Sequence, residues 1–395
     1  MMKRTVIGYH DNCMDGFVAG MIAHTKAIYD GMPNIQMIPV NYNEAPFRVY
    51  PNDDVILVDF CFDPQVIQTM REIGANVTIV DHHETQIQKL TDSQMGKYGD
   101  QAAPNISFTC DCRMAEAKHT FFSDLVTNKD TAGGEYRAFL CDSREVNLQQ
   151  RESGASITWR LAERAKGFTE FAARFMNYGS RHPVAELRYL IELARIHDLY
   201  QHNGKLDHDA TRFANWFKDF SSARREEHDF MKANPAKSFE VFSKMKADFI
   251  MVPMSKKLRI GEEITQRMLR VIRERCEQTR EIKFIHQIGM AALPPGTRVG
   301  FIPGEFKDVS ISMAGNVLVK EYGYDVAVMT AVSGDKITVL SMRSDQFGKN
   351  VNVGEFCKAM EAQGYAIKGG GHRNAAGCNI ATEALKSFID FNPVL

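Results

Sequence analysis

Residues 53–83, DDVILVDFCFDPQVIQTMREIGANVTIVDHH, decide the fold. Residues 53–60 form a nearly continuous apolar run that ends in Asp-Phe, which is typical of a strand buried on both faces. Asp63-Pro64 is a strong helix start and Gly74 a helix stop, so the segment between them predicts a helix. Residues 75–83 predict a second strand that ends in Asp-His-His. A strand, a helix and a strand in this order predict a parallel sheet with a right-handed crossover.

The same alternation precedes this stretch. Residues 4–10 and 34–40 predict strands, and residues 15–31 predict a helix that ends at Gly31. Further along, the loop-like composition of residues 85–150 predicts an irregular insertion. Two helical patterns, at 152–168 and 185–200, complete the first domain. We therefore predict an α/β domain over residues 1–204 with a mainly parallel sheet and an insertion at about 85–150.

The remainder of the chain predicts two further regions. Residues 205–297 read as a mostly helical connecting region. Residues 298–395 predict a smaller α/β domain in which helices alternate with a strand–turn–strand unit, followed by the glycine-rich run GGGHRNAAG. The insertion also holds residues that could ligate zinc, although their spacing is not that of a structural zinc site: Cys110, Cys112, His119 and Cys141.

Composition excludes several classes of protein. A hydrophobic content of 44% and a charged content of 25% are typical of a soluble globular chain. The net charge of -1 argues against a protein that coats nucleic acid duplexes through a global basic field. The apolar runs are far shorter than the ~20 residues needed to cross a bilayer, and the first residues lack a signal-peptide pattern. Eight cysteines without a regular framework indicate reduced thiols, so we expect a cytoplasmic protein without a membrane partner.

Acidic and histidine residues follow three of the predicted strands. His10, Asp59 and the Asp81-His82-His83 triplet fall at carboxyl ends of strands, where open α/β sheets form their crevices. Each has an ordinary reading by itself; Asp59, for example, could cap the helix that begins near Asp63. Together with Asp15 and Asp198 they supply the mixture of carboxylates and imidazoles that suits Mn²⁺, Mg²⁺ or Fe²⁺. Two such ions can activate a water and brace a phosphoryl group during in-line attack.

Six segments resemble a known family, in its order. HDNCMDGFVAG, ILVDF, IVDHHE and ARIHDLY resemble the four N-terminal motifs of the DHH phosphoesterase superfamily. LSMRS and GGGHRNAAG resemble the substrate-binding motifs of the DHH-associated C-terminal domain, and SGASITW resembles a segment of one branch of the family. The resemblance covers about 1–85, 150–205 and 298–395. It implies an N-terminal DHH catalytic domain and a C-terminal substrate-binding domain.

The resemblance also implies a role for each matching residue. His10 and Asp59 would hold one metal, and Asp15, Asp59, His82 and Asp198 the other, with Asp59 bridging. Asp81 would orient a histidine, and His83 would donate a hydrogen bond or transfer a proton near the phosphate. The substrate would be bound by two groups of residues in the C-terminal domain: Ser341, Arg343 and Ser344, and then Gly369, Gly370, Gly371, His372 and Arg373.

The implied activity is hydrolysis of phosphodiester or phosphomonoester bonds in short oligonucleotides or nucleotides, by a water that two divalent metals activate. Mn²⁺ is the expected metal, with Mg²⁺ or Fe²⁺ as alternatives, and a homodimer is a family-level expectation. A RecJ-like exonuclease acting on longer single strands is the second reading. A third is a nucleotide-binding or regulatory protein with weak catalysis, because Cys13 stands where many family members carry an aspartate ligand of the first metal. A thiolate is softer than a carboxylate and prefers zinc or iron to Mn²⁺.

Overall fold

The structure is a computed structural model of the chain. It divides into two compact units, Met1–Glu262 and Glu263–Leu395, and the boundary falls within one long helix. The residues that it describes are 3–42, 44–83, 86, 89, 136–140, 152–176, 182–199, 207–284, 293–302, 306, 309–333, 337–344, 351–384 and 389–390. The predicted insertion, with its candidate zinc ligands, lies outside these residues except for 86, 89 and 136–140.

The first unit is built on a parallel sheet of five strands in the order β2-β1-β3-β4-β5. β5 is a correction to the sequence analysis, which placed these residues in an irregular insertion because polar and glycine-rich segments precede them. The strands are β1 (Thr5–His10), β2 (Ile35–Val40), β3 (Asp54–Val58), β4 (Asn76–Asp81) and β5 (Tyr136–Leu140).

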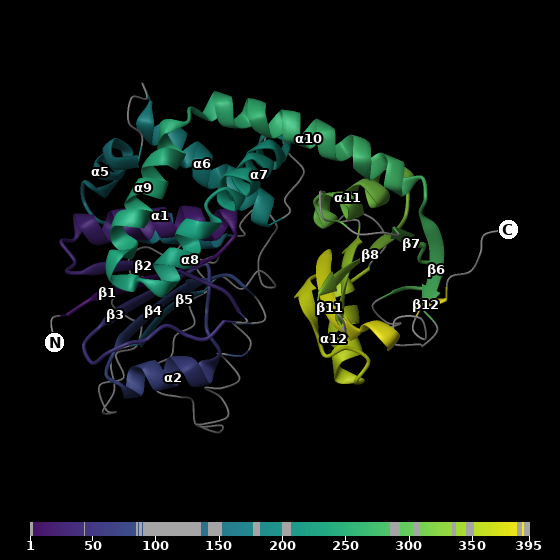
Figure 1. The fold of residues 1–395 in the computed structure, drawn as a ribbon, viewed down its shortest axis with the longest axis horizontal. Coiled ribbons are helices and arrows are strands. Elements are labelled where there is room, and N and C mark those ends of the chain that lie inside the picture. The colour runs from purple at the N-terminus through teal and green to yellow at the C-terminus, as the bar shows by residue number, and fades with distance from the viewer. Residues whose placement is uncertain are drawn as a thin grey trace, which may run out of the picture. The chain divides into compact units, whose positions relative to one another are not determined.

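Helices cover both faces of this sheet. Figure 1 shows α2 (Pro64–Glu72) on one face and α1 (Met14–Tyr29) with α8 (Arg225–Ala233) and α9 (Ser238–Met251) on the other. α2 buries only Ile67 and Met70, whereas α1 is buried around most of its circumference because further helices pack over it. Those helices include α4 (Gly154–Ala162), α5 (Phe168–Met176), α6 (Pro183–Asp198) and α7 (Asp207–Ser222).

The helical region after residue 205 contributes to the core of the first unit. Phe213, Trp216, Phe242 and Phe249 lie in the same buried apolar cluster as Phe17 of α1. The unit therefore continues to Glu262, inside α10 (Met254–Cys276), which differs from the boundary at 204 predicted from the sequence. Within the described ranges, no helix combines the length and the apolarity that a membrane span requires.

The second unit is built on a mixed sheet of seven strands in the order β10-β11-β9-β8-β7-β6-β12. β8 (Val326–Ser333) and β9 (Ile337–Ser344) form the predicted antiparallel pair, and α11 (Ile311–Tyr322) and α12 (Val353–Ala362) are the predicted helices. β6 lies in a stretch that the sequence analysis read as helical, and its short run REIKF is a strand instead. The remaining strands are β6 (Arg280–Phe284), β7 (Val299–Ile302), β10 (Lys368–His372), β11 (Ala375–Ala381) and β12 (Ile389–Asp390).

A buried basic pair joins α1 to α9. Lys246 Nζ donates to His24 Nδ1 at 2.9 Å, and Ser243 Oγ lies 3.2 Å from His24 Nε2. Burial lowers the pKa of Lys246 to about 7. Burial and then the charge of Lys246 lower the pKa of His24 to about 2. Folding therefore favours the neutral forms of both groups.

This pair predicts that stability rises with pH. Between pH 7 and the ordinary lysine pKa of 10.5, the unfolded chain holds a proton that folded Lys246 has lost, so the free energy of unfolding increases with pH. His24 adds the same trend between pH 2 and 6.5. Lys246→Met is expected to flatten the rise between pH 7 and 8, measured by urea unfolding. Lys244→Met, on the exposed side of α9, is the matched control, and an unchanged slope in the Lys246 variant would contradict the prediction.

Candidate metal centre

The candidate centre lies at the carboxyl edge of the parallel sheet, beside the point where the strand order reverses. β1 lies between β2 and β3, and open α/β sheets bind their ligands at such a switch point. His10 is the last residue of β1, Asp59 directly follows β3, and Asp81 ends β4. The chain topology therefore brings the three motifs together, as the sequence analysis expected of strand ends.

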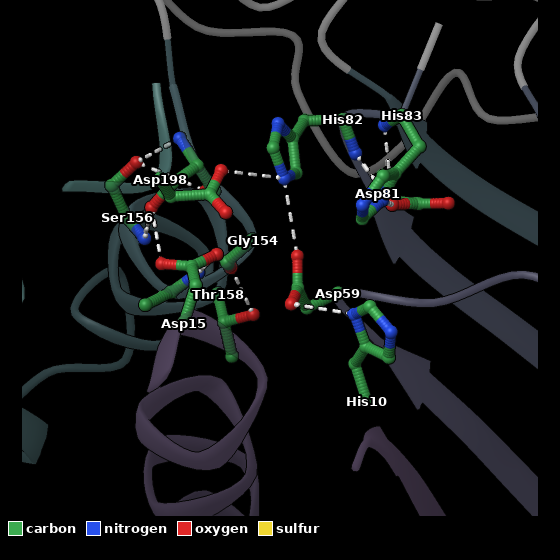
Figure 2. Close-up of polar contacts among 12 residues, drawn as sticks. His10, Asp15, Asp59, Asp81, His82, His83, Gly154, Ser156, Thr158 and Asp198 are labelled. Atoms are coloured by element: carbon green, nitrogen blue, oxygen red, sulfur yellow. Dashed lines mark hydrogen bonds and ion pairs between the residues drawn. The ribbon is translucent and has the colours of Figure 1, made fainter. Parts of the chain in front are cut away.

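Asp59 lies at the middle of this arrangement (Figure 2). Its side chain is completely buried; Oδ1 lies 3.1 Å from His82 Nε2, and Oδ2 lies 3.5 Å from His10 Nδ1. Its backbone is in the left-handed region at φ +55°, which Asp and Asn tolerate better than most residues. Burial raises the pKa of Asp59, but the contacts with His10 and His82 outweigh it and hold the pKa well below the ordinary value.

Asp198 and His82 extend the centre toward α6. Asp198 is the last residue of α6, and its Oδ2 lies 3.1 Å from the same His82 Nε2 that contacts Asp59. Burial lowers the pKa of His82, but the charges of Asp198 and Asp59 outweigh it and raise the pKa well above the ordinary value. A single imidazole nitrogen thus faces two carboxylates.

Asp15 is held by the beginning of α4, a contact that the sequence analysis missed. Ser153 Oγ donates to Asp15 Oδ1 at 2.6 Å, and the backbone N–H of Ala155 donates to Oδ2 at 3.0 Å. Ser153 also caps α4 through a capping box with Ser156. The Ser-x-x-Ser spacing in SGASITW was the available signal, since it marks a helix N-terminus that can bind an anion.

Asp81 and His83 form a pair beside the centre. Asp81 Oδ1 accepts from His83 Nδ1 at 2.7 Å and from the backbone N–H of His82 at 2.8 Å. Burial lowers the pKa of His83, but the charge of Asp81 outweighs it and raises the pKa. Asp81 therefore fixes the ring of His83 and the backbone of His82.

Among the described residues, three groups of side chains have ligand atoms close enough together to hold a metal ion. In each group the ligand atoms lie within 4.8 Å of one another, and Asp59 and His82 each belong to two groups. The groups are His10–Cys13–Asp59, Asp59–His82–His83 and Asp15–His82–Asp198. Every residue predicted as a metal ligand is thus in a group, Cys13 included.

Unsatisfied atoms and crowded charges fit bound cations. Three buried atoms make no hydrogen bond with a described residue: His10 Nδ1, Asp59 Oδ2 and Asp198 Oδ2. His10 Nδ1 lies at ion-pair distance from Asp59 Oδ2, and His82 Nε2 lies at ion-pair distance from Asp198 Oδ2. Burial and then the charges of Asp59 and Asp198 raise the pKa of Asp15. Burial and these neighbouring carboxylates also raise the pKa of Cys13. A divalent cation would offset this repulsion, and carboxylate with imidazole is a donor set for Mn²⁺, Mg²⁺ or Fe²⁺.

The predicted substrate residues gather on three neighbouring strands of the second unit. Ser341 and Arg343 of β9 pair with Gly377 and Ala375 of β11, which pairs in turn with the glycine strand β10. Ser344 is bonded through its backbone N–H to Asn374 O at 3.1 Å. Gly369, Gly370, Gly371 and His372 lie in β10, and Arg373 follows in an exposed turn.

Arg343 and Gly369 have partners that the sequence analysis did not identify. The buried Arg343 guanidinium donates to Ser312 Oγ in the first turn of α11 at 2.6 Å and to Met342 O at 2.7 Å. The backbone N–H of Gly369 donates to the Glu361 carboxylate at 2.8 Å. Gly369 must be glycine, because an added Cβ would lie 2.2 Å from Cys357 O in α12.

Comparison with known proteins identifies the second unit. Residues 299–392 match the family model of the DHHA1 domain. No curated protein matches the chain. The match agrees with the DHH-associated C-terminal domain that the sequence predicts, and together with the DHH motifs of the first unit it supports the DHH phosphoesterase superfamily. This superfamily contains phosphoesterases and exonucleases.

Three solved structures that match the chain do so at low sequence identity. One is described as the DHH domain of a member of a family of ribosomal proteins, at 13% identity and a TM-score of 0.46, over 98% of this chain and 84% of that one. RecJ from Thermus thermophilus in complex with Mn²⁺ is 14% identical with a TM-score of 0.46, over 97% of this chain and 50% of that chain. Exonuclease RecJ bound to manganese is 14% identical with a TM-score of 0.44, over 97% of this chain and 86% of that chain.

Proposed function

We propose that the chain is a metal-dependent phosphoesterase that hydrolyses phosphodiester or phosphomonoester bonds of short oligonucleotides or nucleotides. The observation that carries this proposal is the position of Asp59, whose two oxygens face His10 and His82 and which belongs to two of the three ligand groups. A carboxylate shared in this way is what two neighbouring metal sites require. Bound divalent ions would lower the pKa of a water and neutralise charge on a phosphoryl group.

The protein side chains would have separate tasks in this reaction. His10, Cys13 and Asp59 would hold one ion, and Asp15, Asp59, His82 and Asp198 the other. His83, whose Nδ1 is bound to Asp81, would present its other nitrogen to the phosphoryl group as a donor. Arg343 and the glycine strand would bind the phosphate or base of the substrate, since a guanidinium fork and backbone N–H groups both suit phosphate oxygens.

The test is a substrate panel with Mn²⁺, Mg²⁺ or Fe²⁺. Short oligonucleotides, cyclic dinucleotides, nucleotide phosphates, polyphosphate and long single strands are incubated with the full chain, and products are separated by chromatography. We expect release of mononucleotides or phosphate from the short substrates, fastest with Mn²⁺. Faster hydrolysis of long single strands would instead favour the RecJ-like activity.

Cys13 favours one alternative, a nucleotide-binding or regulatory protein with weak catalysis. A soft thiol stands in the first ligand group, where a hard carboxylate would suit Mn²⁺ better. Under this alternative, calorimetry detects nucleotide binding, but no member of the substrate panel is hydrolysed with any of the three metals. Elemental analysis of the purified protein would then show one metal or none, and Cys13→Asp would raise metal content and activity.

A further inference from the structure

The turn between β1 and α1 lies between two of the proposed ligands of the first metal. Residues outside the DHH motifs hold this turn in place. His10 precedes this turn and Cys13 ends it, so Asp11 and Asn12 alone separate the two ligands. Asp11 Oδ1 accepts a hydrogen bond from Nδ1 of His228, and Asp11 Oδ2 accepts from Lys232 Nζ at 3.0 Å. Both basic residues belong to α8.

The turn needs such support for two physical reasons. Asp11 is 2% exposed, and a buried carboxylate is costly unless it is paired and hydrogen-bonded. Asn12 adopts a left-handed backbone conformation at φ +54°, which costs more than the ordinary regions even for asparagine and is easier to keep where neighbours hold the turn. Ser221 at the end of α7 donates to Asn12 Oδ1 at 3.3 Å and supplies part of that support.

The α8 contacts act on one half of the centre only. Asp15 is held separately by Ser153 and Ala155 of α4, and Asp198 is fixed at the end of α6. Loss of the Asp11 contacts would therefore move His10 and Cys13 without releasing Asp15. The side chains of α8 that face Asp11 are all basic, since Arg225 also lies 3.9 Å from its Oδ2.

We propose that His228 and Lys232, acting through Asp11, are positioning residues that place His10 and Cys13 as ligands of the first metal. This inference rests on the proposed function, because it requires the centre to bind metal. It makes the helical region after residue 205 part of the site, although the family resemblance does not extend there. Neither residue touches the metal or the substrate; each acts on the turn that carries the ligands.

Co²⁺ titration followed by absorption spectroscopy tests the proposal. A Co²⁺–thiolate bond gives a near-ultraviolet charge-transfer band, and the part of this band that Cys13→Ser removes reports Cys13, whereas visible bands report Co²⁺ at either site. We expect the charge-transfer band in the wild-type chain and its loss in Cys13→Ser. His228→Leu is expected to weaken Co²⁺ affinity for this band about 10- to 100-fold, with the other site preserved. His228→Asn, which keeps a donor for Asp11, is expected to restore most of the affinity.

Two further variants guard against a general folding defect. Lys232→Met removes a partly exposed ammonium and is expected to weaken the band in the same direction as His228→Leu. Arg224→Ala removes the 2.8 Å ion pair between the start of α8 and Asp248 of α9 but no contact with Asp11, so it should leave the band intact.

The outcomes separate this inference from the proposed function. If the charge-transfer band of both His228→Leu and Lys232→Met appeared with the Co²⁺ affinity of the wild-type chain, the positioning role would be overturned. The metal centre itself would be unaffected by this result. Co²⁺ binding without a thiolate band would overturn the assignment of Cys13 as a ligand and with it this inference. A wild-type chain that binds no Co²⁺, Mn²⁺ or Fe²⁺ would overturn the proposed function itself.

Discussion

Substitution of Asp59 by asparagine is expected to remove metal from the centre and to lower hydrolysis about 10³-fold or more. Asp59 belongs to two ligand groups, so one amide would weaken both sites at once. Loss of a shared anionic ligand removes several kcal/mol of transition-state stabilisation, and about 4 kcal/mol corresponds to a ~10³-fold change in rate. Elemental analysis and initial rates on the cleaved substrate measure the two effects.

Asparagine is the right replacement because of the backbone at this position. At φ +55°, asparagine is tolerated nearly as well as aspartate, whereas alanine would add strain. Mn²⁺ in excess should raise the thermal midpoint of the wild-type chain by mass action and leave that of Asp59→Asn nearly unchanged. Asp63→Asn is the matched control, since the Asp63 side chain is 60% exposed and pairs only at the surface with Lys89. If Asp59→Asn kept both metals and full activity, the two-metal mechanism would have to be abandoned.

The sheet of the first unit was predictable because its signals are local. The apolar run at 53–60 is continuous since β3 is covered on both faces, by α2 on one side and by α1 and its neighbours on the other. Parallel strands with crossovers must place their carboxyl ends at one edge, so the proximity of His10, Asp59 and His82 followed from topology without any contact being known.

The strands that were missed lacked this local signature. β5 is short and follows a long segment of loop-like composition, and its pairing with β4 is decided by the sheet edge that β4 leaves free. REIKF of β6 is mostly charged and follows a long helix, so its periodicity continued to favour a helix. In both cases tertiary pairing, not propensity, determines the strand.

Partners of buried polar groups were the least predictable part of the site. Ser153 and Asp15 are 138 residues apart, and His228 and Asp11 are 217 apart. The motif SGASITW marked a helix start, but nothing in the sequence indicates which carboxylate that helix would face. The basic face of α8 reads in the sequence as an ordinary solvated face, because only the fold shows that Asp11 is buried beneath it.

Substitution of Gly154 by alanine is expected to cause the second large loss of activity. A Cβ added to Gly154 would lie 2.5 Å from Asp59 Cβ and 2.6 Å from Asp59 Oδ1, distances that real Cβ contacts do not show. Gly154 is the first residue of α4, between the two groups that bind Asp15. Gly154→Ala must therefore displace Asp59 or the start of α4, and we expect at least ~100-fold loss of activity, since a shift of about 1 Å at a reacting centre has that effect.

A second helical glycine provides the control for the added methyl group. Gly20 of α1 faces the Tyr9 ring, and a Cβ added to Gly20 would lie 3.0 Å from Tyr9 Cγ. Tyr9 is not a proposed metal ligand. Gly20→Ala also gains helix propensity, by about 1 kcal/mol, so it should keep metal content and most activity. Gly154→Ala should instead lose metal while its free energy of unfolding in urea falls by only about 1–3 kcal/mol. If Gly154→Ala kept the metal content of the wild-type chain, Gly154 of α4 would not lie as close to Asp59 as it does in the structure.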